Sequence, residues 1–225
     1  MKNNLYLFII LIVLISCQSK QDNKSESSSS LTVVPIQQAR NLSIGSEVRI
    51  QGTISVASGN FFSSTPFGYA LQDNTAGIYI IDSIPPMQDE FKLGEIVEVT
   101  GILGESNNML FIEEVTALKK GKTKLISAVN VKTGEVDEST EGMILHTSGI
   151  IDSLFNDLPY GYKVYINDGS GLLNIFINTS TGLLSDTIEW QISDSFSVTG
   201  FSAQYDTEYE IEPRTRDDMQ VFTDN

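Results

Sequence analysis

One pattern of short alternating runs occurs twice in this chain, at an interval of about 90–100 residues. Gly52 interrupts the first alternating run of one copy, and Gly149 interrupts the corresponding run of the other. The segment 93–101 ends in Val-Thr-Gly, and the same three residues end the segment 193–200. A repeat unit of this length predicts two similar domains, because solenoids are built from repeats of about 20–50 residues.

Each copy contains five runs in which apolar and polar residues alternate. Alternation with a period of two predicts half-buried β-strands, and Gly, Asn and Asp between the runs predict turns. A glycine inside the first and fourth runs of each copy indicates a bend, of the kind that lets one strand serve both halves of a small barrel. We therefore predict an all-β chain with two tandem five-stranded Greek-key barrels. The predicted strands are 48–54, 68–73, 78–82, 94–103 and 109–113, then 145–151, 163–168, 172–177, 193–200 and 208–212.

The first residues of the chain predict export. Lys2 precedes eleven apolar or aromatic residues, Leu5 to Ile15, and this run is too short to span a membrane, which needs about 20 residues. Leu14-Ile15-Ser16 then leads to Cys17, which is the only cysteine of the chain. This arrangement resembles the bacterial lipobox, in which the cysteine is acylated, with palmitate among its acyl chains, and becomes the new N-terminus. The alternative is an ordinary cleaved signal peptide followed by a chance thiol.

Composition divides the chain into five segments. The serine-rich stretch 17–30 cannot bury a core and is predicted to be a disordered tether after the signal peptide 1–16. We predict module 1 over 31–120, a connector over 121–141 and module 2 over 142–225.

The repeated motifs resemble exported OB-fold modules of Bacteroidota, which occur beside secreted nucleases and lamin-tail domains and in tandem on lipoproteins. The similarity is carried by Gly-Tyr-Ala-Leu-Gln-Asp at 68–73, by Gly-Glu-Ile-Val-Glu-Val-Thr-Gly at 94–101 and by Tyr-Glu-Ile-Glu-Pro-Arg at 209–214. The resemblance implies two OB folds over most of residues 43–222. Gln18 after the cysteine implies the outer membrane, at its periplasmic face or at the cell surface.

The charge of the chain opposes one common function of OB folds. The full chain carries 14 basic and 29 acidic side chains, and removing residues 1–16 removes Lys2 alone, which leaves a net charge of −16. Such a chain repels polyanions at long range, so single-stranded nucleic acid is a disfavoured partner. We therefore expect the partner to be a protein or a glycan, whose identity the sequence does not give.

Aromatic residues near the second and third strands of each copy are the candidate ligand contacts, because OB folds bind along those strands and the adjoining loops. Rings in such places can stack on bases, sugars or peptides, but they can equally fill the barrel or an interface between modules. Phe61 and Phe62 are the strongest candidates, since two adjacent loop residues do not easily both face inward. The full set is Phe61, Phe62, Phe67, Tyr69, Tyr79, Tyr160, Tyr162 and Tyr165.

The sequence offers no catalytic constellation, so we expect no enzyme activity, no cofactor and no dedicated metal site. His146 is the lone histidine, and the loop 168–171 lacks the full acidic series of a calcium loop, although a weak surface calcium site stays open. Arg214 is expected to form an ion pair with a nearby acid at the chain end. The sequence thus predicts a lipid-anchored binding module of the bacterial envelope; the alternatives are a single-stranded nucleic-acid binder and an accessory subunit of an exported nuclease.

Overall fold

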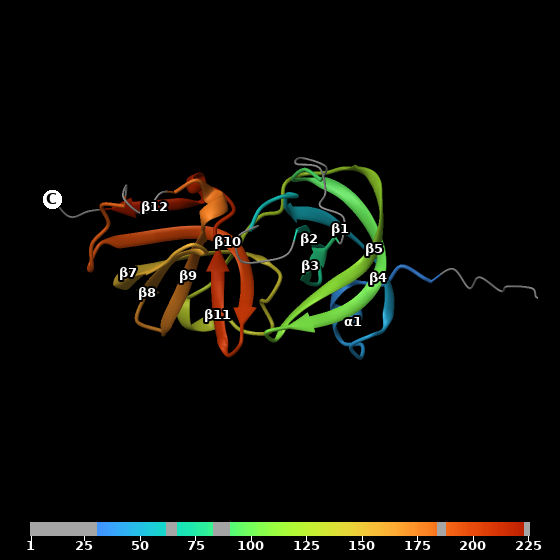
Figure 1. The fold of residues 1–225 in the computed structure, drawn as a ribbon, viewed down its shortest axis with the longest axis horizontal. Coiled ribbons are helices and arrows are strands. Elements are labelled where there is room, and N and C mark those ends of the chain that lie inside the picture. Colours follow the sequence, from blue (N-terminus) through green and yellow to red (C-terminus); the bar gives the residue numbers. More distant parts are fainter. Residues whose placement is uncertain (1–30, 62–66, 83–90, 184–187, 223–225) are drawn as a thin grey trace, which may run out of the picture. The chain divides into compact units, whose positions relative to one another are not determined.

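The computed structural model describes residues 31–61, 67–82, 91–183 and 188–222, and the chain from Leu31 to Asn225 clusters as one compact unit. The predictions made for Cys17, for the tether 17–30 and for Phe62 lie outside the described residues. Most described residues belong to β-strands, as the alternating pattern predicted (Figure 1). Within the described ranges, no helix is long and apolar enough to cross a membrane.

The first sheet is a closed barrel of five strands in the order β1-β2-β3-β5-β4 (Figure 1). Neighbouring strands are antiparallel except β3 and β5, which run parallel. This order, with one parallel pair, is that of the OB fold. A short helix, α1, precedes the barrel, and its Ile36 and Ala39 are fully buried in the barrel core. The elements are α1 (Ile36–Arg40), β1 (Glu47–Val56), β2 (Gly68–Gln72), β3 (Gly77–Ile81), β4 (Glu95–Ser106) and β5 (Met109–Lys122).

The second sheet repeats the same topology. Strands β7, β8, β9, β11 and β10 follow one another, and β10 pairs with β7 to close the ring, again with one parallel pair, β9 with β11. Two further strands extend this sheet, β6 beside β7 and β12 beside β10. The two tandem OB-type barrels are therefore confirmed. The elements are β6 (Val129–Asn130), η1 (Thr133–Glu135), β7 (Ile144–Asp157), β8 (Gly161–Asn167), β9 (Leu172–Asn178), η2 (Thr179–Thr181), β10 (Ser195–Tyr205), β11 (Glu208–Glu212), η4 (Arg216–Asp218) and β12 (Met219–Phe222).

The long first strand of each barrel does serve both halves. Strand β1 pairs with β4 as far as Thr53 and with β2 from Thr53 onward, and its pairing register with β2 shifts between Ile54 and Val56. Strand β7 changes partner from β10 to β8 at Ile150, and its register shifts between Ile151 and Ser153. Such irregularities bend a strand and raise its twist, which a small barrel needs in order to close.

The two barrels differ in their last strand. In the first barrel β5 runs unbroken for 14 residues and pairs along the whole of β4, two residues past the predicted end of module 1. In the second barrel Pro213 follows β11, and proline has no N–H to donate to a ladder. The chain leaves the sheet there, turns through η4, and returns as β12 to pair with the first half of β10.

The connector packs on the second barrel and is not only a solvated linker. Val136 is buried in the second core. The Thr133 hydroxyl donates to Asp168 Oδ1 at 2.7 Å, and Ser170 also donates to this carboxylate. These hydrogen bonds lower the pKa of Asp168 well below its usual value, with the Ser170 bond contributing most. Asp168 therefore joins the connector to the β8–β9 turn.

A third core cluster joins the two barrels. It combines Val56, Phe61, Ala70, Tyr79 and Phe111 of the first barrel with Ile144, Phe201 and Ala203 of the second. The backbones also meet directly, because a Cβ added at Gly77 would overlap the carbonyl oxygen of Gly142. The interface is thus apolar and closely packed.

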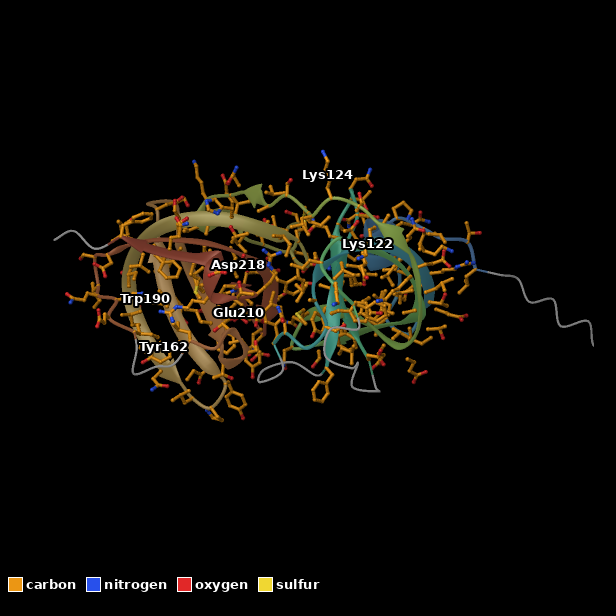
Figure 2. All side chains as sticks on the ribbon, turned by 90° about the horizontal axis from the view of Figure 1, so that it is seen from above. Lys122, Lys124, Tyr162, Trp190, Glu210 and Asp218 are labelled. Atoms are coloured by element: carbon orange, nitrogen blue, oxygen red, sulfur yellow. The ribbon has the colours of Figure 1, made fainter. Side chains whose placement is uncertain are left out.

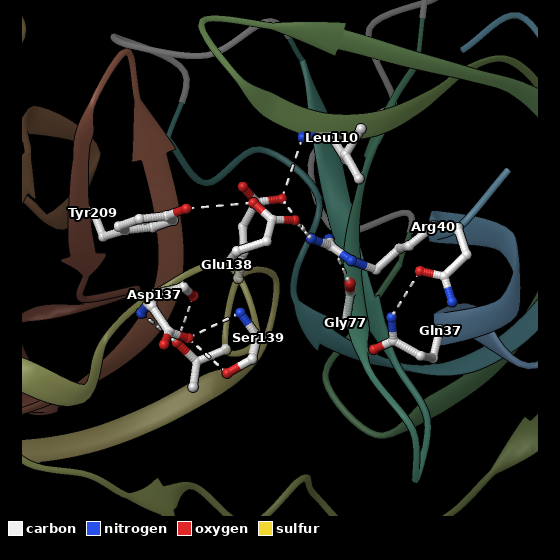
Figure 3. Close-up of polar contacts among 11 residues, drawn as sticks. Gln37, Arg40, Gly77, Leu110, Asp137, Glu138, Ser139 and Tyr209 are labelled. Carbon is white, nitrogen blue, oxygen red and sulfur yellow. Dashed lines mark hydrogen bonds and ion pairs between the residues drawn. The ribbon is translucent and has the colours of Figure 1, made fainter. Parts of the chain in front are cut away.

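An ion-pair network joins the buried pair Arg40–Glu141 to the exposed Glu138 (Figure 3). Arg40 Nη2 lies 2.9 Å from Glu138 Oε1 and 2.9 Å from Glu141 Oε1, and Arg40 Nη1 donates to the Gly77 carbonyl at 3.2 Å. The backbone N–H of Leu110 also donates to Glu141. Burial raises the pKa of Glu141, although Arg40 acts in the opposite direction. Helix α1 is therefore tied to the residues that lead into the second barrel.

Candidate functional site

The outer face of β8, β9 and β11 differs from the inner face of the same strands. Residues such as Val164, Ile175 and Ile211 point inward and are fully buried in the core. Their neighbours along each strand must point outward, because side chains alternate across a sheet. The outward set is largely polar and comprises Lys163, Tyr165, Asn174, Phe176, Asn178, Glu208, Glu210 and Glu212.

The strand register brings these outward residues into rows. Asn174 pairs with Glu210 on β11 and with Tyr165 on β8, and Phe176 pairs with Lys163 in the next row. Asn174 Nδ2 donates to Glu210 Oε2 at 2.8 Å, which fixes the position of that carboxylate. The rows place a carboxylate, a ring and an ammonium group side by side on one surface.

A cleft of about 540 Å³ lies over this surface. Its base is formed by Lys163, Phe176 and Glu210, the last of which is labelled in Figure 2. Its rim is formed where strands end and turns begin: Asp157 ends β7 and Tyr160 lies in the turn that follows, Tyr205 ends β10, and Asn107 lies between β4 and β5 of the first barrel. Tyr160 and Tyr205 are 53% and 56% exposed. Strands two and three with these two loops form the surface on which OB folds bind ligands.

A second hollow of about 340 Å³ adjoins the cleft and shares Asn107, Tyr205 and Glu210 with it. It is lined by apolar side chains and by two more carboxylates, and the residues that it does not share are Ile81, Ser106, Met109, Phe111, Glu113, Ala203, Gln204 and Glu212. Residues of both barrels therefore form its walls.

Two of the lining carboxylates are strongly perturbed. Burial raises the pKa of Glu210 to about 7, and Lys163 opposes this shift. Burial and the nearby charge of Glu210 raise the pKa of Glu212 well above its usual value, whereas a hydrogen bond with Asn178 acts to lower it. Carboxylic acids that stay protonated near neutral pH mark candidate functional sites, because their charge depends on what binds beside them.

The corresponding face of the first barrel is covered. Ala70 on β2, Tyr79 on β3 and Phe111 on β5 point outward there, and all three are buried in the core cluster that joins the barrels. Phe201 of the second barrel lies against this face, with its ring centroid 5.9 Å from that of Tyr79. The second barrel thus occupies the surface on which the first would bind a ligand.

This arrangement decides where the predicted aromatic residues of the first copy lie. Phe61, one of the two strongest predicted ligand contacts, is 1% exposed and packs on Phe201 with ring centroids 6.0 Å apart. Its φ of +62° turns the backbone into the left-handed region, and its N–H donates to Ser180 Oγ of the second barrel. Tyr69 points into the barrel and packs on Phe91, whereas Phe67 is 48% exposed.

The predicted tyrosines of the second copy are divided between both faces. Tyr160 lines the cleft. Tyr162 packs against the second core, and is labelled in Figure 2. Tyr165 lies on the outer face, where it makes an edge contact with Phe155, and burial and Glu208 raise its pKa to about 12. The structure therefore brings one of the predicted residues to the cleft and places another on the same face.

Sequence reasoning missed Tyr205, Phe176, Glu210 and Glu212. A usable signal was present in Glu208-Tyr-Glu-Ile-Glu212, where three acids alternate with two core residues. Alternation puts those three carboxylates on one face of one strand, whereas acids adjacent in sequence diverge.

Arg214 and His146 both contact neighbouring side chains. Arg214 forms the expected ion pair, with Nη2 2.8 Å from Asp218 Oδ1, and it also donates to the Ser55 carbonyl of the first barrel. His146 Nδ1 lies 2.9 Å from Thr199 Oγ1. Across the residues that the structure describes, no three His, Cys, Asp or Glu side chains are grouped so that they could hold a metal ion.

Comparison with known proteins gives structural likeness alone. No family model matches the chain, and no curated protein matches it. A murine DNA-binding protein bound to double-stranded DNA is similar at a TM-score of 0.43 and 9% identity, over 79% of this chain and 96% of that one. The Ifi202 HINa domain in complex with a 20-bp DNA duplex gives 0.40 and 10%, over 79% and 98%. An OB domain from Methanosarcina mazei gives 0.31 and 15%, over 39% and 83%.

Proposed function

We propose that this chain is a non-catalytic, lipid-anchored protein of the bacterial outer membrane that binds a protein partner through the cleft of its second barrel. The observation that carries the proposal is the contrast between two equivalent surfaces. The surface of the first barrel is buried by the second, whereas that of the second barrel stays open and carries Tyr160 and Tyr205 at its rim. Exposed tyrosines around a partly polar depression are typical of protein recognition sites.

The charges of the cleft favour a protein over a nucleic acid. Lys163 lies 4.0 Å from Asp157, and Glu210 lines both the cleft and the second hollow. A groove for nucleic acid needs several cations that follow the phosphates. The net charge of −16 after removal of residues 1–16 acts in the same direction.

The anchor and the absence of catalysis rest on the sequence. Cys17 after Leu-Ile-Ser supports lipidation, and the chain contains one histidine and one cysteine. That histidine, His146, contacts Thr199 and does not line either hollow. A nucleophile would therefore have no histidine base beside it in the cleft.

Three experiments test these proposals separately. A photo-crosslinking residue placed at Tyr160 or Tyr205 should yield a discrete adduct in cells, and one placed at Phe222, which is 56% exposed on β12, should not. Equal adducts at all three positions would contradict a role for the cleft. Metabolic labelling with palmitate should mark the wild-type chain and not Cys17→Ser, and equal labelling would contradict the anchor. A labelled single-stranded oligonucleotide should show no rise in fluorescence anisotropy with the chain at low salt, and tight binding would favour the nucleic-acid function.

A further inference from the structure

The second hollow has two kinds of wall. Ile81, Met109, Phe111 and Ala203 give it apolar sides. Glu113, Glu210 and Glu212 give it carboxylates. A space lined by both apolar side chains and carboxylates matches a ligand that has an apolar stem and a cationic head.

Glu212 is the residue that points to a ligand. It is 5% exposed and lines the hollow, and its Oε2 has no hydrogen-bond partner among the described residues. A buried polar atom without a partner costs about 1–3 kcal/mol, and more when the group is charged. A cation in the hollow would supply the missing partner. Phe111 adds an aromatic ring, to which a cation is also attracted.

The groups around Glu212 do not themselves supply that cation. Glu210 lies on the same strand, and Glu208 and Asp157 act on Glu210 with the same sign. Tyr79 faces Glu212 from the first barrel, since the charge of Glu212 helps to raise the pKa of that phenol. Lys163 lies beside Asp157 in the neighbouring cleft, and it acts to lower the pKa of Glu210. Glu113 lines the hollow from β5.

We propose that this hollow is a side-chain pocket for an arginine or lysine of the protein partner. The inference rests on the proposed function and names the chemistry that the partner presents. An arginine or lysine buries its aliphatic stem along apolar surface while its charged head reaches polar groups. In this hollow the apolar side chains would contact the stem, and the carboxylates would contact the charged head. At about 340 Å³ the space lies at the low end of ligand pockets, which suits one side chain.

Proton release is the signature of such binding. An inserted cation favours the ionised forms of Glu210 and Glu212, whose pKa values are raised by burial in the free protein. Binding at neutral pH therefore expels protons, and affinity increases as the pH rises from 5 to 8. A ligand without charge has no reason to show either effect.

The test uses matched short peptides and the full chain purified in detergent. Arginine between glycines, with both ends blocked, is compared with the same peptide carrying citrulline, which keeps the shape and removes the charge. We expect the arginine peptide to bind at least about tenfold more tightly, which corresponds to about 1.4 kcal/mol. It should shift the methyl resonances of Met109 and Ala203, and its binding heat should depend on the ionisation enthalpy of the buffer.

Variants show whether the carboxylates carry the effect. Glu212→Gln keeps the shape of the side chain and should reduce arginine binding at least about tenfold, with no change for citrulline. Glu47→Gln removes the same charge from an exposed position on β1 and should change nothing. If Glu212→Gln does not fold, Glu210→Gln and the pH dependence of the wild type give the same answer. Equal binding of arginine and citrulline, or no methyl shifts at millimolar peptide, overturns the inference. The proposed function stands in that case if the crosslinks at Tyr160 and Tyr205 still form.

Discussion

Arg40→Met tests whether the buried ion pair holds the two barrels together. Arg40 and Glu141 have side-chain exposures of 4% and 1%, and Arg40 Nη2 lies 2.9 Å from Glu141 Oε1. Methionine keeps most of the volume and removes the charge, which leaves the N–H of Leu110 as a hydrogen-bond donor to Glu141. Removing one partner of a buried pair costs about 3–5 kcal/mol, because the other charge stays buried without compensation. We expect the free energy of unfolding to fall by about that amount at pH 7.

If the loss of stability in Arg40→Met comes from the unpaired charge of Glu141, it should depend on pH. Arg40→Met removes the Arg40 charge, which is the main effect opposing the burial of Glu141, and leaves the Leu110 N–H to oppose it alone, so the folded-state pKa of Glu141 rises further. A group whose folded-state pKa is raised contributes full stability below its unfolded pKa, and that contribution is lost as the pH rises through the folded pKa. The difference between wild type and variant should therefore shrink from pH 7 to pH 5, by about 1.4 kcal/mol per unit of pKa shift within that range.

Urea is the denaturant of choice because it does not screen ion pairs, and two probes follow the transition. Trp190, the only tryptophan, packs edge-on against Phe196 and reports on the second barrel, whereas far-UV circular dichroism reports on both. Replacing both Arg40 and Glu141, by Met and Leu, should restore stability to within about 1–2 kcal/mol of wild type, since buried ion pairs are often no better than apolar residues. A double variant as unstable as Arg40→Met, or a loss that is equal at pH 5 and pH 7, would refute the electrostatic explanation.

Three further predictions concern stability. Thr147→Val should raise the free energy of unfolding by about 1 kcal/mol in urea titrations, because the buried Thr147 hydroxyl has no partner among the described residues; a loss would mean that a water satisfies it. The raised pKa values of Glu210 and Glu212 mean that the stabilising contribution of each protonated carboxyl is full below its ordinary pKa of about 4.5 and is lost as the pH rises through its pKa in the folded protein, which is about 7 for Glu210. Glu210→Gln should therefore gain stability relative to wild type between pH 5 and pH 8, and a difference that stays constant over this range would contradict the raised pKa of Glu210. Gly77→Ala should lower the free energy of unfolding by about 1–3 kcal/mol, because its Cβ would overlap the Gly142 carbonyl. The unfolding transitions followed by fluorescence and by circular dichroism should then separate, and coincident, unshifted transitions would show that the barrels are not coupled there.

The strands and their order of appearance could be predicted because strand formation here is a local property. Alternation with a period of two is clear in the burial of the long strands β1, β4 and β10, whereas β2 and β3 are almost wholly buried, and turn residues separate the strands. The inward position of Thr147 could also be found, since the repeat aligns it with Ile50. Strand β12 was missed because Pro213 displaces it from the run that ends at Glu212, and its place beside β10 is set by a long-range return of the chain.

The candidate site could not be predicted from aromatic residues alone, because exposure depends on how the barrels pack. The loop sequence around Phe61 is compatible with a stacking platform, and only the contact with Phe201 shows that the ring is covered. For the acids on β11, the sequence shows which residues share a face but not how deeply they are buried. Their alternation was visible in the sequence, but their burial depends on Met109, Phe111 and the other first-barrel residues that close the hollow.

The equivalent outward positions of the two barrels explain why the face of the first barrel is covered by the second, whereas the corresponding face of the second barrel carries a cleft. The registers align Gly68, Ala70, Tyr79 and Phe111 of the first barrel with Lys163, Tyr165, Asn174 and Glu210 of the second, in that order. Small and apolar residues on the first face allow the second barrel to pack on it without unpaired polar groups. On the second face Lys163 and Glu210 carry ionisable groups, and an apolar surface packed over them would remove water without supplying hydrogen-bond partners. The two copies therefore have different roles in the fold. The first barrel supports the second and contributes walls to the hollow where we propose that a cationic side chain binds.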